Sequence, residues 1–184
     1  LILGIHFLLL KKCKIFDEKT IVRCYTGRSM RINVRKHERR GYQSIKMSNI
    51  LEKQFLKQRN DFEKSCVERD KKYHFPQGVI FETDIAYAKD KNKAHRLDRY
   101  RPKGKEAQIL PVIINVHGGG LLLGNKEFNK YFCALLSKKG FLVYSMEYRL
   151  IPVCTFFDQL RDIFLAMDFV KEHAAADGGD LSHV

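Results

Sequence analysis

The amino-acid sequence predicts an α/β protein whose mainly parallel sheet is flanked by helices. The aliphatic run over 109–116 is typical of a strand buried on both faces of a parallel sheet. A helical pattern over about 126–139, an apolar strand over 141–147 and a second helical pattern over about 156–175 follow it. Because the joints are short, these alternating segments indicate βαβ units.

Apolar spacing supports both helices. Asn125 can cap the first helix, and Gly140 can end it. The residues expected on its inner face are Phe128, Tyr131, Phe132, Leu135 and Leu136. Those expected on the inner face of the second helix are Leu160, Ile163, Phe164, Met167 and Val170.

A third helical pattern and three extended pieces precede this region. The helix is expected to run from an N-cap at Ser48 to about Lys72, with one apolar face of Ile50, Leu51, Phe55, Phe62, Cys66 and Val67. The extended pieces are 79–81, 85–87 and 95–100, the last of them stopped by Pro102 and Gly104.

The charge of the chain is concentrated at one end. Of the net +13, residues 1–46 carry 12 Lys/Arg and 3 Asp/Glu, a net of +9. We therefore predict two parts: a basic N-terminal extension over 1–46, and the N-terminal part of a folded domain over 47–184. The extension is either a poorly ordered basic arm or a non-native segment upstream of a natural start at Met47. Its basic pairs lack the aromatic interleaving typical of nucleic-acid binding, so no specific nucleic-acid partner is expected.

Cysteine usage and hydropathy indicate a cytoplasmic protein. The five cysteines are widely spaced, odd in number and without a Cys-x-x-Cys pair, which favours free thiols in a reducing compartment. The apolar run over 1–10 is too short to span a bilayer, which needs about 20 residues. The histidines show no metal-ligand spacing, so neither a metal nor a cofactor is expected.

The most informative motif is His117-Gly118-Gly119-Gly120, directly after the expected strand. Glycines without side chains leave backbone N–H groups that can approach a ligand and hold a developing oxyanion. The spacing does not fit the dinucleotide motif G-x-G-x-x-G. A glycine-rich loop without chemistry and a phosphate cradle stay open as alternatives.

Several motifs in order carry a family resemblance. His117–Gly120, then Tyr148-Arg149-Leu150 with Pro152, and then Phe156, Leu160 and Asp162 resemble the hormone-sensitive-lipase-like esterases of the α/β-hydrolase superfamily. Leu97-Asp98 with Tyr100-Arg101-Pro102, and the segment 177–184, are similar to flanking parts of these enzymes. The chain departs from the family at Leu121, at Glu147 and over 152–155.

The resemblance, which covers about 79–184, implies the N-terminal half of an α/β-hydrolase fold and a carboxylic-ester hydrolase, an esterase or lipase, acting on small acyl esters through a Ser-His-Asp triad. It implies that Gly119 and Gly120 donate to the oxyanion, that Gly118 shapes the turn and that His117 orients the loop. Tyr148 and Arg149 would anchor a strand end, with Arg149 paired to Asp162.

The 184 residues contain no Gly-x-Ser-x-Gly. We therefore expect a fragment that lacks nucleophile, acid and base and is inactive alone. A non-catalytic basic binding protein on a degenerate hydrolase scaffold is the alternative from another class, and a peptidase or arylformamidase relative is the alternative within the enzymes. The oligomeric state is not predicted.

Overall fold

The structure is a computed structural model that describes residues 20–23, 29–32 and 49–182. The chain divides into two compact units, one of residues 8–46 and one of residues 1–7 with 47–184. In the smaller unit, β1 (Thr20–Arg23) and β2 (Ser29–Ile32) form an antiparallel pair that the sequence did not predict. The other expectations for 1–46, disorder among them, and the cap at Ser48 lie outside the described residues.

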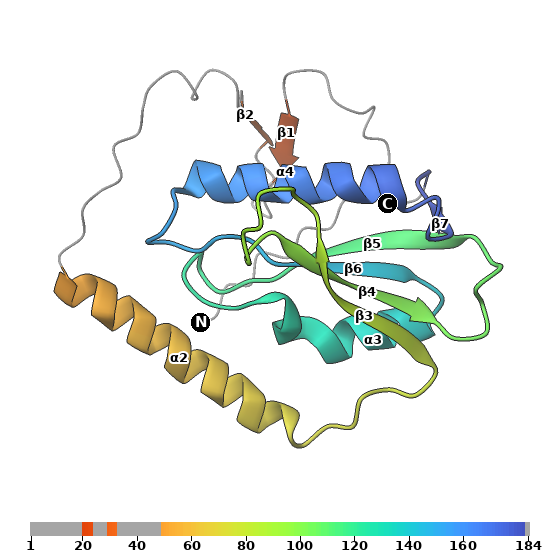
Figure 1. Cartoon of the computed structure of the whole chain (residues 1–184), viewed down its shortest axis with the longest axis horizontal. Helices are drawn as coiled ribbons and strands as arrows, with labels where there is room; N and C mark the ends of the chain where they lie inside the picture. The colour runs from red at the N-terminus through yellow and green to blue at the C-terminus, as the bar shows by residue number, and fades with distance from the viewer. Residues whose placement is uncertain (1–19, 24–28, 33–48, 183–184) are drawn as a thin grey trace. The chain divides into compact units, whose positions relative to one another are not determined.

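The larger unit contains a five-stranded mixed sheet in the order β3-β4-β6-β5-β7 (Figure 1). Its strands are β3 (Val79–Ala86), β4 (Arg96–Pro102), β5 (Leu110–Val116), β6 (Leu142–Met146) and β7 (Gly179–Asp180). β5 runs parallel to β6 and β7, whereas β4 is antiparallel to β3 and β6. The predicted α/β class is therefore confirmed, with the parallel pairing confined to one side of the sheet.

The antiparallel pairing of β3 with β4 follows from the short connection between them. Only nine residues join β3 to β4, which suits a hairpin rather than a crossover. The two short strands predicted over 79–87 form one strand with a register shift between Glu82 and Ile85, and Asp84 within the shift has a φ of +60°. A bulge of this kind interrupts the alternation of side chains, which made one strand look like two.

Two helices cover opposite faces of the sheet (Figure 1). The first is α3 (Lys130–Lys138), which follows a 3₁₀ turn, η1 (Lys126–Asn129), and the second is α4 (Phe156–His173). Along β6, Leu142 and Tyr144 pack in the cluster that contains α4 residues, and Val143 packs with Cys133 of α3. Because successive side chains of a strand point to opposite faces, β6 contributes residues to the core on each face of the sheet.

Helix starts follow the sequence closely. The Asn125 side chain accepts a hydrogen bond from Glu127 N at 3.1 Å, as the predicted cap requires. Thr155 and Asp158 form a reciprocal capping box at the start of α4. Leu160 and Val170 of the predicted α4 face are buried.

Two predicted helix faces were partly wrong. In α3, Phe132 and Leu135 are 53% and 54% exposed, whereas the small residues Cys133, Ala134 and Ser137 form the buried face. In α2 (Asn49–Asp70), Ile50 and Val67 are 70% and 59% exposed, and Leu51 is also exposed. Its inward residues include Arg59, and this charged residue could not be distinguished by pattern from a solvated one.

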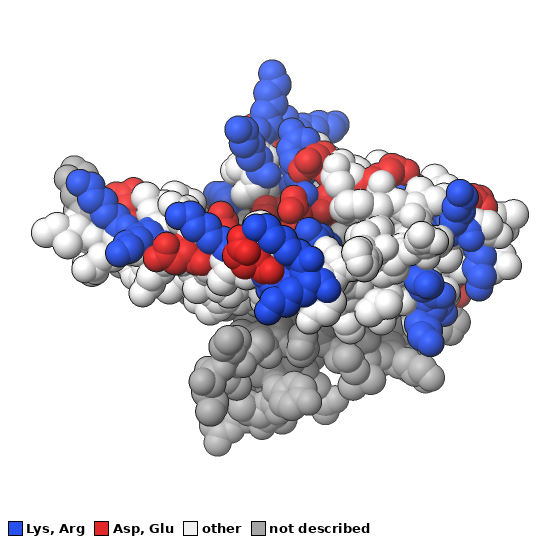
Figure 2. All heavy atoms as spheres, turned by 90° about the horizontal axis from the view of Figure 1, so that it is seen from below, with Lys and Arg blue, Asp and Glu red and all other residues white. Residues whose placement is uncertain are grey.

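The face of the molecule in Figure 2 shows Lys and Arg interspersed with Asp and Glu over the described residues. Residues 47–184 hold 22 Lys/Arg and 18 Asp/Glu, so a mixed surface is expected there. Within the described ranges, no helix is long and apolar enough to cross a membrane.

Candidate active site at the end of the parallel strands

The glycine turn follows β5 and has a backbone that needs glycine. Gly119 has a φ of +137° and Gly120 a φ of +64°, and Leu121 continues with a φ of +70°. A Cβ on Gly119 would lie 1.9 Å from the carbonyl oxygen of Leu123, whereas a Cβ on Gly120 would meet open space. Hydrogen bonds from the amides of Leu122 and Leu123 to Gly119 O, at 3.3 and 3.0 Å, close the turn.

The amides of Gly119 and Gly120 take no part in the hydrogen bonds that close the turn. No residue in the described part of the chain accepts a hydrogen bond from the backbone N–H of Gly119 or Gly120. Two neighbouring N–H groups without protein acceptors are donors that can bind an anion.

His117 lies beneath this turn. It is 2% exposed, with Nδ1 3.0 Å from Gly118 O and Nε2 3.1 Å from Glu147 Oε1. Its ring stacks on Tyr148 at 4.3 Å between centroids, and the Tyr148 hydroxyl donates to His117 O at 2.9 Å. Burial raises the pKa of Tyr148 to about 12, which keeps this hydroxyl a donor at neutral pH. Both ring nitrogens of His117 are therefore occupied in holding the strand ends.

Arg149 and Asp162, predicted as a pair, are joined by a bidentate contact. Arg149 Nε and one terminal nitrogen donate to the two carboxylate oxygens at 2.9 and 2.7 Å, and Arg149 N adds a third bond at 3.0 Å. Asp162 is fully buried, and its hydrogen bonds raise the pKa of Arg149. His95 Nε2 lies 3.0 Å from the same carboxylate, outside hydrogen-bond geometry. This cluster fixes the segment after β6.

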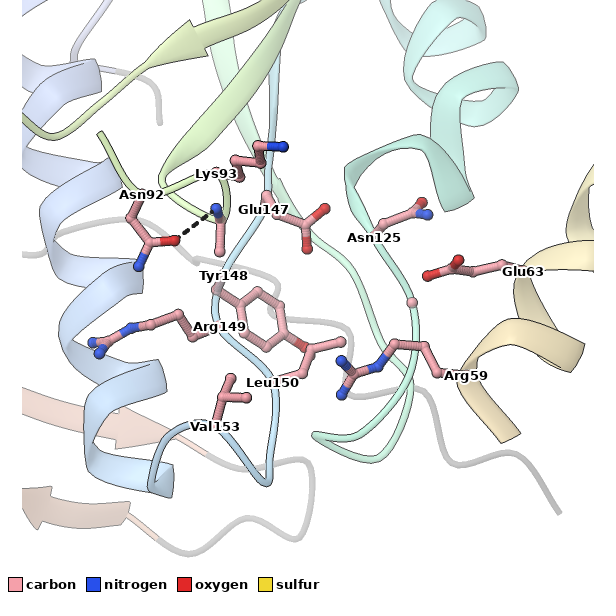
Figure 3. A pocket seen from close by; sticks show the side chains of 12 residues that line it. Arg59, Glu63, Asn92, Lys93, Asn125, Glu147, Tyr148, Arg149, Leu150 and Val153 are labelled. Atoms are coloured by element: carbon pink, nitrogen blue, oxygen red, sulfur yellow. Dashed lines mark hydrogen bonds between the residues drawn. The ribbon is translucent and has the colours of Figure 1, made fainter. Parts of the chain in front are cut away.

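A pocket of about 540 Å³ opens beside the turn (Figure 3). Four segments line it: α2, the loop before β4, the end of the glycine loop and the segment after β6. Tyr148 and Arg149 are among its lining residues, together with Gly124. Gly118, Gly119 and Gly120 are not, so the turn borders the pocket rather than forming its wall. The described residues contain no group of three or more His, Cys, Asp or Glu that could hold a metal ion.

Comparison with known proteins places this geometry in a family context. Residues 97–184 match the BD-FAE family model. An isoprenylcysteine alpha-carbonyl methylesterase of Arabidopsis thaliana is 29% identical over 90 residues, which are 49% of this chain and 21% of that protein. A tuliposide A-converting enzyme of Tulipa gesneriana is 30% identical over 86 residues, covering 41% of this chain and 23% of that protein.

Solved esterases have the same fold. Esterase B of Lactobacillus rhamnosis superposes with a TM-score of 0.63 and 28% identity, over 71% of this chain and 42% of that one. A bacterial heroin esterase superposes with a TM-score of 0.59 and 27% identity, over 68% and 39%. The chain carries part of an α/β-hydrolase fold. The predicted resemblance to α/β-hydrolase esterases is confirmed, and the chain spans about a fifth of the curated relatives that it matches.

The sequence did not predict the buried ion pair of Lys126 and Asp98. Lys126 Nζ lies 2.8 Å from Asp98 Oδ1, with Asp98 fully buried and the Lys126 side chain 8% exposed. Lys126 N donates to Glu147 Oε2 at 3.0 Å, and Ser145 Oγ donates to Lys126 O at 2.7 Å. Burial raises the pKa of Asp98, although Lys126 opposes this. One lysine therefore connects Asp98 to the carboxylate that contacts His117.

Two further polar residues near the turn were also missed. Gln159 of α4 is 1% exposed and donates to Leu121 O and Arg149 O, both at 2.9 Å. Arg59 of α2 donates to Leu122 O in the same loop at 3.1 Å. Polar side chains at helical spacing gave no signal for these roles, because the partners are backbone oxygens far away in sequence.

Proposed function

We propose that this chain supplies the oxyanion-binding turn of a carboxylic-ester hydrolase of the esterase or lipase type. One observation carries the proposal: the N–H groups of Gly119 and Gly120 have no acceptor among the described residues and follow a parallel strand, in a loop whose Gly124 lines a pocket. The similarity to a methylesterase and to a heroin esterase supports an ester substrate.

The proposed chemistry is acyl transfer. A serine attacks the acyl carbon of a small ester, and the carbonyl oxygen becomes an oxyanion. Gly119 and Gly120 donate to that oxygen, and Gly118 shapes the turn. His117 holds the turn through Gly118 O and Glu147 and is not the catalytic base. Tyr148, Arg149 and Asp162 hold the segment that faces the turn.

The triad itself is not among these residues. Since no Gly-x-Ser-x-Gly occurs in the 184 residues, the proposed nucleophile lies elsewhere, as do the acid and the histidine base. The 184-residue chain alone is therefore expected to show negligible triad-dependent hydrolysis.

A reducing, cytoplasmic compartment is part of the same proposal. The three cysteines within the described ranges, Cys66, Cys133 and Cys154, are free thiols, and Cys13 and Cys24 lie outside those ranges. Burial raises the pKa of Cys133 to about 12 and that of Cys154 to about 11, which disfavours their thiolates.

The test begins with the coding sequence beyond the Val184 codon, followed by expression of the whole reading frame. Hydrolysis of short p-nitrophenyl esters is then measured for the whole product and for the 184-residue chain. We expect activity that serine reagents abolish in the first and none in the second. Gly119→Ala keeps the backbone N–H, but its Cβ would lie 1.9 Å from Leu123 O and must shift the turn. In the whole product this displacement of the donor should lower kcat by about 10²–10³-fold, the cost of losing an oxyanion donor.

Gly104→Ala is the matched control, because Gly104 also has a positive φ, +80°, but lies in the loop before β5 with open space around its Cβ position. It should leave kcat nearly unchanged. The proposal fails if the reading frame ends without a nucleophile motif, if Gly119→Ala and Gly104→Ala behave alike, or if the 184-residue chain shows saturable, serine-reagent-sensitive hydrolysis.

A further inference from the structure

We propose that Arg59 of α2 is a positioning residue that clamps the two loops beside the glycine turn. Its Nε donates to Leu122 O at 3.1 Å, and one terminal nitrogen donates to Ile151 O at 2.9 Å. Leu122 belongs to the glycine loop, and Ile151 belongs to the segment after β6. One side chain from a third element therefore joins two loops that are 29 residues apart in sequence. Its consequence for catalysis rests on the proposed function.

The clamped loops already form one structural unit. Leu121 O accepts hydrogen bonds from Ile151 N at 3.1 Å and from Gln159 Nε2 at 2.9 Å. Leu121 directly follows Gly120 and shares its positive φ. A shift of the segment at Ile151 would therefore be transmitted through Leu121 to the amides that we assign to the oxyanion.

The geometry suits arginine and no other cation. A guanidinium is planar and carries donors in a fixed fork, so it can satisfy two carbonyl groups at once. A lysine ammonium in the same place is a point charge on a flexible stem. Figure 3 shows the Arg59 side chain extending from α2 toward Leu150, at the edge of the pocket that Arg59 also lines.

α2 has separate contacts that keep it in place. Phe62 packs on Phe128 at 5.3 Å between ring centroids, and Arg69 donates to Phe128 O at 3.0 Å. Tyr131 Oη donates to Asp70 O at 3.1 Å. These contacts lie along the C-terminal half of α2 and attach it to η1 and α3. Removing the Arg59 side chain should therefore release the loops without detaching the helix.

The experiment is residue-resolved amide hydrogen exchange on the full 184-residue chain. The reporting amides are those of Leu122, Leu123 and Ile151, whose hydrogen bonds close the turn and join the loops. In Arg59→Ala they should exchange about tenfold faster, the change expected when charge-assisted bonds are lost from a local opening equilibrium. Amides of β6 should be unchanged. Arg59→Lys should give an intermediate rate.

The matched control is Lys57→Ala, which removes an exposed cation from the same helix and should change none of these rates. The proposal is overturned if the loop amides in Arg59→Ala stay within about twofold of the wild-type rate. If Arg59→Ala instead speeds exchange in β6 as well, Arg59→Lys decides: faster exchange confined to the loops supports the clamp, and wild-type rates overturn it. Because exchange needs no reaction, absence of esterase activity would leave this result intact.

Discussion

Two ion pairs near the start of α3 have the same chemistry and different surroundings. Lys126 and Asp98, 2.8 Å apart, lie under the glycine turn with side chains 8% and 0% exposed. Lys130 and Asp70, 3.2 Å apart, join α3 to α2 with side chains 29% and 11% exposed. The first pair is removed from water and the second is partly solvated, so the two pairs differ in energy by more than their distances suggest. The pair that is connected to His117 through Glu147 is thus desolvated, whereas water can partly replace the pair between α2 and α3.

The largest effect is expected for Asp98→Ala. Among the described residues, Lys126 then keeps only the exposed carboxylates of Asp84, at 3.3 Å, and Glu127, at 3.7 Å. Loss of its buried partner should cost about 3–5 kcal/mol of unfolding free energy. Urea unfolding followed by circular dichroism measures the loss. Asp168→Ala, at an exposed position of α4, is the control and should change stability little. A loss below about 1 kcal/mol for Asp98→Ala would show that water, or the carboxylates of Asp84 and Glu127, compensate Lys126 for its lost partner.

A double variant tests whether the loss in Asp98→Ala comes from the unpaired charge of Lys126. Replacing both partners, as in Asp98→Leu with Lys126→Met, removes the charge as well as its counterion. Buried ion pairs replaced by apolar residues are often neutral in stability, so the double variant should recover most of what Asp98→Ala loses. Failure to recover would mean that Asp98 acts mainly through its other bond, from Asp84 N at 3.0 Å.

Within the turn, Gly119→Ala and Gly120→Ala should separate close contact from backbone strain. Both positions have a positive φ, but only a Cβ on Gly119 meets the carbonyl of Leu123. The overpacked variant should be less stable than Gly120→Ala by about 1–3 kcal/mol, measured by thermal unfolding of the two proteins side by side. Equal stabilities would indicate that the loop relaxes away from the added methyl group.

The sequence predicted the elements whose signal is local. The aliphatic run of β5, the cap at Asn125 and the inward residues Leu160 and Val170 of α4 all lie where periodicity indicated. The pairing of Arg149 with Asp162 could also be anticipated from the motif order. Each of these depends on neighbours in sequence or on a strand end that two βαβ units bring together.

The parts that were missed depend on distant placement. Lys126 pairs with Asp98 28 residues away, Arg59 bonds Ile151 92 residues away, and Gln159 bonds Leu121 38 residues away. A charged or amide side chain at helical spacing is usually solvated. The exposed Phe132 shows the same limit, since the small residues Cys133 and Ala134 of α3, and not Phe132, pack in the core. A pattern of polarity alone cannot tell a desolvated lysine from an exposed one.

The smallest effect is expected for Lys130→Ala, which tests the pair of Lys130 and Asp70. Lys130→Ala removes an ion pair that is partly solvated, so it should cost about 0.2–1 kcal/mol, and the cost should shrink as salt screens the charges. Urea unfolding at low and at high ionic strength measures the loss of stability and its dependence on salt. Asp98→Ala should lose its larger amount at either salt concentration, because buried charges are screened much less. A salt-independent loss of several kcal/mol for Lys130→Ala would contradict this. It would mean that the Lys130–Asp70 pair stabilises the fold as strongly as the buried Lys126–Asp98 pair.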